Sequence, residues 1–302
     1  MGHRLLGGTL FLTGELAAAR RRLEEALSLY EQDPSLYQGM QALYAQDHKS
    51  TVLCYLALTL TLLGEIDAGL RAGETSVAHS QVLGDPHTVN YSLCFLAAVH
   101  HIRRDGEQAL RRATESLEMA REQGFANWIG VSQMIRGESL MSNGACEEGL
   151  KEITLGMQAH SGIEAAAYQP FGISLLVRGL LAVSRLADAS GALSRALAIS
   201  ERTGDRFYLP ELLRLKGELL ARNGKLAQAE DALRAAIEVA RQQGARLFEL
   251  RSAASLCKLV RGPHQAALLR EVLEPVYRWF GPDVQARDVQ EARTVLEDGK
   301  AA

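Results

Sequence analysis

One stretch, residues 214–244, constrains the fold of the whole chain because it describes a unit that recurs along the sequence. Apolar residues recur at intervals of three and four on both sides of Asn223-Gly224, which predicts two amphipathic helices joined by a tight turn. Glycine accepts the left-handed backbone that ends a helix, so Gly224 and Gly244 mark the two helix ends. Gly217 lies inside the first helix and predicts a close approach of the second helix. One such pair buries too little apolar surface to be stable alone, so copies must stack on one another.

The unit returns with a period of about 40 residues. The second helices of the pairs are expected to end at Gly84, Gly124, Gly162, Gly204 and Gly244. The turns within the pairs are expected at Gly64, Gly106, Gly144, near Ser184 and at Gly224. The chain is rich in alanine, leucine and glutamate and has only 7 prolines, which favours helices. The pattern predicts an all-α protein, a right-handed α-solenoid of stacked antiparallel helix pairs with capping helices at its C-terminal end.

A single superhelical domain is predicted over residues 1–302. Its expected segments are a first repeat at 1–33, an insert with a short helix at 34–47, five regular repeats at 48–244, and a last helix pair with capping helices at 245–298. The final helix, expected at 288–298, has the polar outer face that the exposed end of a repeat stack requires. A helix is expected to begin almost at Met1 without a capping residue, which suggests a trimmed chain or the removal of an upstream domain.

A helix pair with a small residue in its first helix and a glycine turn resembles the tetratricopeptide repeat, although the period exceeds the usual length of about 34 residues. Over nearly its whole length the chain also resembles the C-terminal helical-repeat region of large bacterial signalling proteins. That resemblance rests on residues 14–20, 44–47, 55–64, 211–220 and 273–280, of which ELLRLKGELL at 211–220 and LEPVYRWF at 273–280 are the most specific. In those proteins the repeats follow a predicted signal-transducing ATPase, joined in turn to a class III adenylate or guanylate cyclase domain or to a DNA-binding domain. The resemblance implies a regulatory arm that binds a partner or effector, without catalysis by this part.

Composition and motifs argue against catalysis and against several kinds of partner. The net charge of −3 offers no basic excess that would neutralise phosphates, so nucleic acid is a poor match as the main partner. The sequence has no GxxxxGK loop, no GxSxG motif and no HExxH motif, which predicts that the chain is not an enzyme and holds no metal or cofactor. Four cysteines without a CxxC pair, no signal sequence, and a longest apolar run of only Val52 to Leu63 predict a cytoplasmic protein without membrane contact.

The predicted binding surface is the concave side of the stack, which the first helices of the pairs would line. Alignment of these helices on their small residue places three basic side chains in one column, Arg136, Arg178 and Lys216. Aromatic or polar-edged residues fall near the starts of the same helices: His48, Asn90, Trp128, Tyr168 and Tyr208. Together they predict a groove with aromatic walls and a cationic floor, suited to an acidic peptide or a small anion. The alternative is that the basic residues pair with Glu138 and Glu218 between repeats and that the aromatic residues only pack the repeats together.

Binding functions of different classes follow from this groove. The first is a non-catalytic protein-interaction scaffold, or regulatory arm of a bacterial signalling system, that binds a peptide or partner domain in the concave groove. A cyclase, an ATPase or a transcription-regulator domain is the partner that the resemblance implies. The alternative is an effector sensor that binds a small anionic ligand in the same groove. An RNA-binding helical repeat also fits the architecture but not the charge, and a homodimer could form through the C-terminal helices or the insert at residues 36–44.

Overall fold

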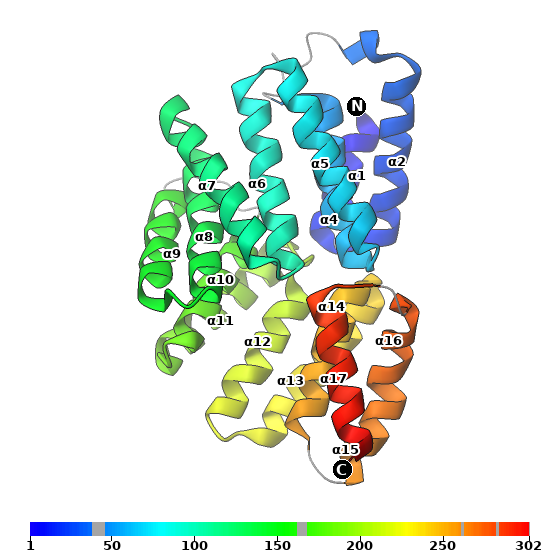
Figure 1. The fold of residues 1–302 in the computed structure, drawn as a ribbon, viewed down its shortest axis with the longest axis vertical. Coiled ribbons are helices and arrows are strands. Elements are labelled where there is room, and N and C mark those ends of the chain that lie inside the picture. Colours follow the sequence, from blue (N-terminus) through cyan, green and yellow to red (C-terminus); the bar gives the residue numbers. More distant parts are fainter. Residues whose placement is uncertain (38–45, 162–167, 261–262, 282–283, 302) are drawn as a thin grey trace.

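Every regular element is a helix in the computed structural model, which describes residues 1–37, 46–161, 168–260, 263–281 and 284–301 (Figure 1). The first helices of the pairs, here called the inner helices, are α1 (Gly2–Thr13), α4 (His48–Leu63), α6 (Pro86–Ile102), α8 (Ala126–Ser142), α10 (Gln169–Ala182), α12 (Leu209–Arg222) and α14 (Arg246–Leu259). The second, outer helices are α2 (Leu16–Gln32), α5 (Ile66–Leu83), α7 (Gly106–Gln123), α9 (Cys146–Ser161), α11 (Leu186–Thr203) and α13 (Leu226–Gln243). A 3-10 turn, η1 (Pro34–Tyr37), follows α2, and the chain ends with α15 (Pro263–Leu268), the π-turn η2 (Leu269–Leu273), α16 (Glu274–Phe280) and α17 (Arg287–Ala301). This arrangement confirms the predicted right-handed α-solenoid.

The period is set by left-handed residues at positions 64, 104, 144, 184 and 224, which join inner to outer helices at a constant interval of 40 residues. Glycine occupies three of these positions, but Arg104 (φ 61°) and Ser184 (φ 59°) occupy the other two. The turn expected at Gly106 is therefore centred on Arg104, and Gly106 is the first residue of α7. A left-handed conformation costs a residue with a Cβ about 1–2 kcal/mol. Something other than backbone preference must therefore explain an arginine at position 104.

Two predicted features lie partly outside the described residues. The helix end expected at Gly162 is one of them. Of the insert predicted at 34–47, only η1 and residues 46–47 are described.

The C-terminal helix α17 buries the apolar face that the sequence predicts for it. The buried residues on this face are Val289, Ala292, Val295 and Leu296.

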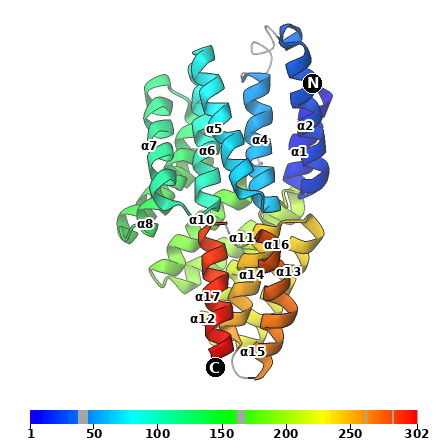
Figure 2. The same cartoon turned by 45° about the vertical axis from the view of Figure 1, so that its right-hand side comes forward.

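The superhelix closes on itself, so that the N-terminal helices lie above the C-terminal ones in both views (Figures 1 and 2). The backbone N–H groups of Arg206 and Phe207 donate to the carbonyl oxygen of Leu12 at 2.7 and 3.1 Å. The Arg251 guanidinium donates to the carbonyl of Ile102 at 2.7 Å. The turn at Gly64 lies against Phe280, where a Cβ would come within 3.1 Å of the ring. The ends of α1, α4 and α6 therefore rest on the last repeats.

A column of aromatic side chains fills the axis of this closed superhelix. Phe11 of α1 packs on Phe207 with ring centroids 4.7 Å apart, which links the first helix to the sixth repeat. Tyr208 contacts Phe171 at 5.0 Å and Phe248 at 5.2 Å. We call these five residues the aromatic core.

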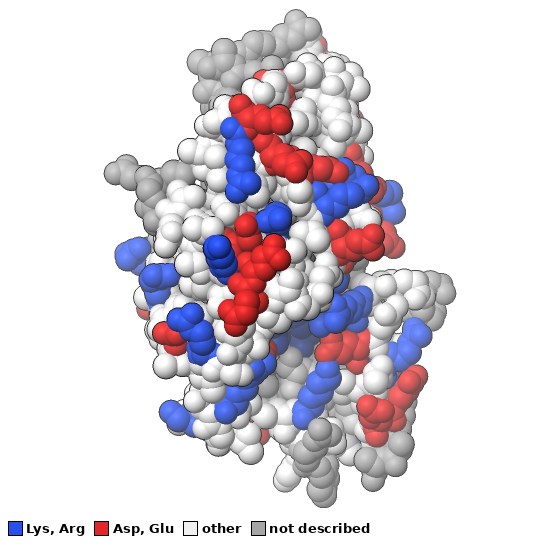
Figure 3. All heavy atoms as spheres, turned by 60° about the vertical axis from the view of Figure 1, so that its left-hand side comes forward, with Lys and Arg blue, Asp and Glu red and all other residues white. Residues whose placement is uncertain are grey.

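The outer helices carry more charged side chains than the inner helices. On the face shown in Figure 3, acidic groups gather in the upper and middle parts and basic groups are scattered over the lower part. No unbroken basic surface is visible on that face. None of the described helices combines the length and the apolar character that crossing a membrane requires.

Glycines allow the paired helices to approach closely, as predicted for Gly217, where a Cβ would stand 2.6 Å from Leu233 Cγ. The contact is tighter between α8 and α9, because a Cβ on Gly137 would stand 2.6 Å from the carbonyl oxygen of Gly149. Backbone cannot move aside as a side-chain tip can. By contrast, a Cβ on the exposed Gly191 of α11 meets nothing within 4 Å.

We expect Gly137→Ala to lower the free energy of unfolding by about 1–3 kcal/mol through overpacking. Gly191→Ala is the matched control and should raise it by about 0.5–1 kcal/mol, because alanine loses less backbone entropy in a helix. Urea unfolding followed by circular dichroism measures both. Equal effects of the two substitutions would contradict the close approach of α8 and α9.

Candidate functional site

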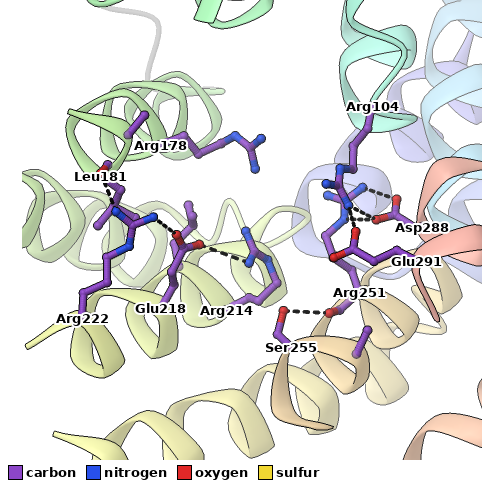
Figure 4. Close-up of a pocket in the computed structure, with 13 residues that line it drawn as sticks. Arg104, Arg178, Leu181, Arg214, Glu218, Arg222, Arg251, Ser255, Asp288 and Glu291 are labelled. Carbon is purple, nitrogen blue, oxygen red and sulfur yellow. Dashed lines mark hydrogen bonds and ion pairs between the residues drawn. The ribbon is translucent and has the colours of Figure 1, made fainter. Parts of the chain in front are cut away.

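A cavity of about 300 Å³ opens between α10, α12, α14, α17 and the end of α6, and we call it the arginine cavity (Figure 4). Five arginines line it: Arg104, Arg178, Arg214, Arg222 and Arg251. Three carboxylates share the lining: Glu218, Asp288 and Glu291. On α12, the positions 211, 214, 218 and 222 are three or four residues apart, so one face of that helix carries four charged side chains toward the interior.

The fully buried carboxylate of Glu211 lies at the centre of this network. Arg214 donates to it at 2.8 and 2.9 Å, and guanidinium nitrogens of Arg178 and Arg251 lie 3.5 Å away. Burial alone would raise the pKa of Glu211, but the charges of Arg214 and Arg251 outweigh it and hold the pKa far below its usual value. The carboxylate is therefore ionised and joins three inner helices, α10, α12 and α14.

A second buried carboxylate, Asp288, fastens α17 to the interior. Arg251 binds it with two hydrogen bonds of 3.0 and 2.7 Å, and Arg104 donates to it at 3.0 Å. Arg104 also pairs with Glu291, which Lys258 contacts as well. Burial opposes ionisation of Glu291, but the hydrogen bonds from Lys258 and Arg104 lower its pKa to about 2. The left-handed turn at Arg104 thus places its guanidinium within ion-pair distance of two carboxylates of α17, Asp288 and Glu291.

The third acid of the network is Glu138 on α8. It accepts from Arg178 at 3.0 Å and lies 2.9 Å from His101 Nδ1. A side cavity of about 100 Å³ adjoins it and shares Arg104 and Arg178 with the arginine cavity. The network therefore runs through α6, α8, α10, α12, α14 and α17.

The basic column predicted from the sequence is not assembled. Arg178 lines the arginine cavity, but Arg136 pairs with Glu152 of α9 at 2.7 Å, and Lys216 is exposed on another face of α12. The sequence also allowed the basic residues to pair with Glu138 and Glu218 between repeats. Arg178 does pair with Glu138, whereas Glu218 pairs with Arg222 at 2.8 Å and not with Lys216. Whether any of these residues binds a ligand stays a prediction.

The aromatic and polar candidates also separate. His48 is buried and packs on Tyr37 at 4.3 Å, and Asn90 is fully buried with its side-chain oxygen accepting from Ser116 at 3.1 Å. Tyr208 belongs to the aromatic core, and its hydroxyl lies 3.4 Å from His101 Nε2. Trp128 and Tyr168 line a common cavity of about 360 Å³ between α1, α4, α6 and α8.

One pattern in the sequence could have predicted this network of ion pairs. The interval of 40 residues places Glu138, Arg178 and Glu218 at one level of successive inner helices, and Glu211 with Arg251 at another. Two of these opposite charges one period apart do pair, Glu138 with Arg178 and Glu211 with Arg251. Alignment on Gly137, Gly179 and Gly217 shifts the repeats by two residues and hides this pattern.

The chemistry available here is recognition of acidic groups. Arginine presents a planar fork of donors that matches a carboxylate, and the buried carboxylates hold several of these forks in place. Among the described residues, no group of three or more His, Cys, Asp or Glu side chains is placed to hold a metal ion.

Known proteins share this architecture. No protein-family profile matches the chain. An uncharacterized protein of Rhizobium meliloti is 24% identical over 250 residues, which are 82% of this chain but only 24% of that protein's length. A Rap protein crystallised with competence and sporulation factor has a TM-score of 0.58 at 16% identity, over 85% of this chain and 74% of that one. The apo form of RapI has a TM-score of 0.55 at 13% identity, over 98% of both chains. The chain is thus a tetratricopeptide-like helical-repeat protein.

We expect Glu211→Gln to lower the free energy of unfolding by about 3–5 kcal/mol, because it leaves buried arginines without their charge partner. Glu218→Gln is the control at the half-exposed rim of the same cavity, where an ion pair contributes about 0–1 kcal/mol. Chemical unfolding at pH 7 measures both. A cost for Glu211→Gln no greater than that for Glu218→Gln would contradict the central role of Glu211.

Asp205 gives the fold a pH dependence of the opposite sign to that of Glu211. Burial raises its pKa to about 6, although the Tyr168 N–H donates to it at 2.9 Å. The folded state therefore holds a proton that the unfolded state releases, so this contribution to stability is lost as pH rises from about 4 through 6.

Asp205→Asn keeps a hydrogen-bond acceptor for Tyr168 and removes the titration. We expect the stability of this variant relative to the unsubstituted protein to rise by about 2 kcal/mol between pH 4.5 and pH 7.5. Urea unfolding of both proteins across this range measures the difference. A difference that does not change with pH would show that Asp205 is ionised throughout.

Proposed function

We propose that this chain is a non-catalytic binding module that takes an acidic segment of a protein partner into the arginine cavity. The observation that carries the proposal is the convergence of five arginines from three helices and one turn on one space of about 300 Å³. Such a space accommodates one or two carboxylate side chains with their backbone.

The contacts of α17 indicate which groups these arginines accept. Asp288 and Glu291 lie three residues apart on one helix and reach Arg104 and Arg251 together. A partner segment with carboxylates at helical spacing would present the same chemistry to Arg222 and Arg178 across the cavity. Both of those guanidinium groups line the cavity and are partly exposed, at 41% and 26%.

Two comparisons support a regulatory role within a longer protein. The chain spans only 24% of the length of the Rhizobium meliloti protein it matches, so a repeat region attached to other domains is a natural arrangement. A Rap protein of similar fold has been crystallised with competence and sporulation factor. Together with the resemblance of residues 211–220 and 273–280, these observations support a cytoplasmic regulatory arm in a bacterial signalling system. Its partner would be a peptide or a cyclase, ATPase or transcription-regulator domain.

A small anionic effector is the second candidate, and the size of the adjoining cavity favours it. The side cavity of about 100 Å³ beside Glu138 would suit a compact anion better than a peptide. An RNA partner is disfavoured by the net charge of −3 and by the mixed charges on the face in Figure 3.

The test compares two arginines with the same local environment. Arg222 and Arg234 each pair with the glutamate four residues before them, at 2.8 and 2.7 Å, but only Arg222 lines the cavity. Fluorescein-labelled decaglutamate is titrated with the protein and followed by fluorescence anisotropy at low salt. We expect Arg222→Gln to weaken binding by about tenfold, which corresponds to about 1.4 kcal/mol, and Arg234→Gln to leave it unchanged.

Competition with citrate separates the two candidates. Displacement of the peptide by equimolar citrate would favour a small anionic effector over an acidic segment. Equal weakening by both substitutions would mean that the peptide binds the general surface charge. Absence of any binding to the unsubstituted protein would refute a carboxylate-binding cavity.

A further inference from the structure

We propose that the side cavity beside Glu138 is a phosphate site, which binds inorganic phosphate or the phosphoryl group of a larger molecule. The side cavity has a volume of about 100 Å³ and lies between the end of α6, the first turn of α7, α8, α10 and the start of α17. Phosphate would be the ligand of the small-anion candidate above, so the site rests on that candidate. It does not require that an acidic segment enters the arginine cavity.

Three guanidinium groups reach the side cavity from three separate elements. Arg104 comes from the left-handed turn after α6, Arg178 from α10, and Arg287 from the first residue of α17. Each presents a planar fork of N–H donors. A carboxylate has two oxygens, which one or two forks satisfy, whereas a phosphate has four oxygens and can accept from three forks at once. Donors from three elements therefore favour a tetrahedral oxyanion over a carboxylate.

Arg287 supplies a positive charge that the fold does not neutralise. Its side chain is exposed, and it forms no ion pair or hydrogen bond with the residues that the structure describes. Arg104 is paired with Asp288 and Glu291, but a single nitrogen, Nη1, makes both contacts. The other N–H groups of its fork can still donate. An anion in the side cavity would therefore meet one unpaired guanidinium and one that is only partly used.

The carboxylate in the lining, Glu138, holds Arg178 in place. Its Oε1 accepts from Arg178 Nε at 3.0 Å, and its Oε2 lies 2.9 Å from His101 Nδ1. Burial would raise the pKa of Glu138, but the interactions with His101 and Arg178 outweigh it and hold the pKa far below its usual value. Glu138 is therefore ionised, and both of its oxygens have partners. A ligand that binds Arg178 gains from this, because the guanidinium is already ordered.

The size of the side cavity suits a single phosphate group. Its volume of about 100 Å³ exceeds the ~30 Å³ that one water occupies in the liquid, but it is far below the 300 Å³ of the arginine cavity. Gly106 and Ala109 of α7 leave this space open, because neither has a long side chain. Ser142 of α8 adds a hydroxyl to the lining. Since Arg287 is exposed, a phosphoryl group could also enter with its ester oxygen toward the solvent.

Isothermal titration calorimetry with inorganic phosphate, in a chloride buffer of constant ionic strength, tests the site. We expect Arg287→Gln to weaken phosphate binding by about tenfold. Arg270→Gln is the matched control and should leave it unchanged, because Arg270 is also exposed and without an ion pair in the described chain but does not line the side cavity. Ser142→Ala should weaken binding by severalfold, which preserves the test if Arg287→Gln fails to fold.

Two further measurements separate the sites and the sources of the phosphate. Arg222→Gln lies in the arginine cavity and outside the side cavity, so it should weaken decaglutamate and leave phosphate unchanged. Failure of one site can thus be told from failure of the other. Phenyl phosphate carries the same group on an ester oxygen. Tighter binding of phenyl phosphate would identify the phosphoryl group of a larger molecule as the ligand, and tighter binding of inorganic phosphate would identify the free ion.

Three results would overturn the proposal. The first is the absence of any heat of binding with millimolar phosphate. The second is an equal loss of phosphate affinity in Arg287→Gln and Arg270→Gln, which would mean that phosphate responds only to the general surface charge. The third is acetate binding as tightly as phosphate, because a site formed by three forks must prefer the tetrahedral anion.

Discussion

The burial of Glu211 among three arginines is the constraint on which the rest of this structure depends. An ionised carboxylate without access to water is tolerated only if cations are fixed around it, so α10, α12 and α14 must stand at one relative height. Arg251 also pairs with Asp288 and Arg178 with Glu138, so the positions of α17 and α8 are fixed as well. Apolar packing alone would allow these helices to slide, whereas directional ion pairs fix their register.

The same constraint explains how the last helix is held against the repeats. With α12 and α14 fixed by charge, α17 closes over them and Arg104 joins it from the other side of the superhelix. The aromatic core then fills the axis, and Phe11 brings α1 against Phe207. The cavity that remains between α10, α12, α14 and α17 is lined by arginines and carboxylates together.

Helix pairs and their turns could be predicted because both depend on local sequence. Periodic leucines and alanines define the helix faces, and glycines such as Gly64 and Gly224 end the helices. The closure of the superhelix could not be predicted, because nothing in the sequence of either segment indicates that the Arg206 N–H donates to the Leu12 carbonyl oxygen. The site was predicted only in part for a related reason. Small residues such as Gly179 suggested a register that differs by two residues from the observed one, whereas the predicted Trp128, Tyr168 and Arg178 each line a cavity.

Closure has a further consequence for how the chain reaches its native state. In an open repeat array every contact is local, so folding spreads from unit to neighbouring unit and the ends fray independently. Here Arg251 binds Ile102 across 149 residues and Arg104 binds Glu291 across 187. Contacts of such long range form late and make folding slow, because a large loop entropy is lost before they form. The array therefore acquires the cooperativity of a globular domain, and its first repeats gain their full stability only after the last ones have been synthesised.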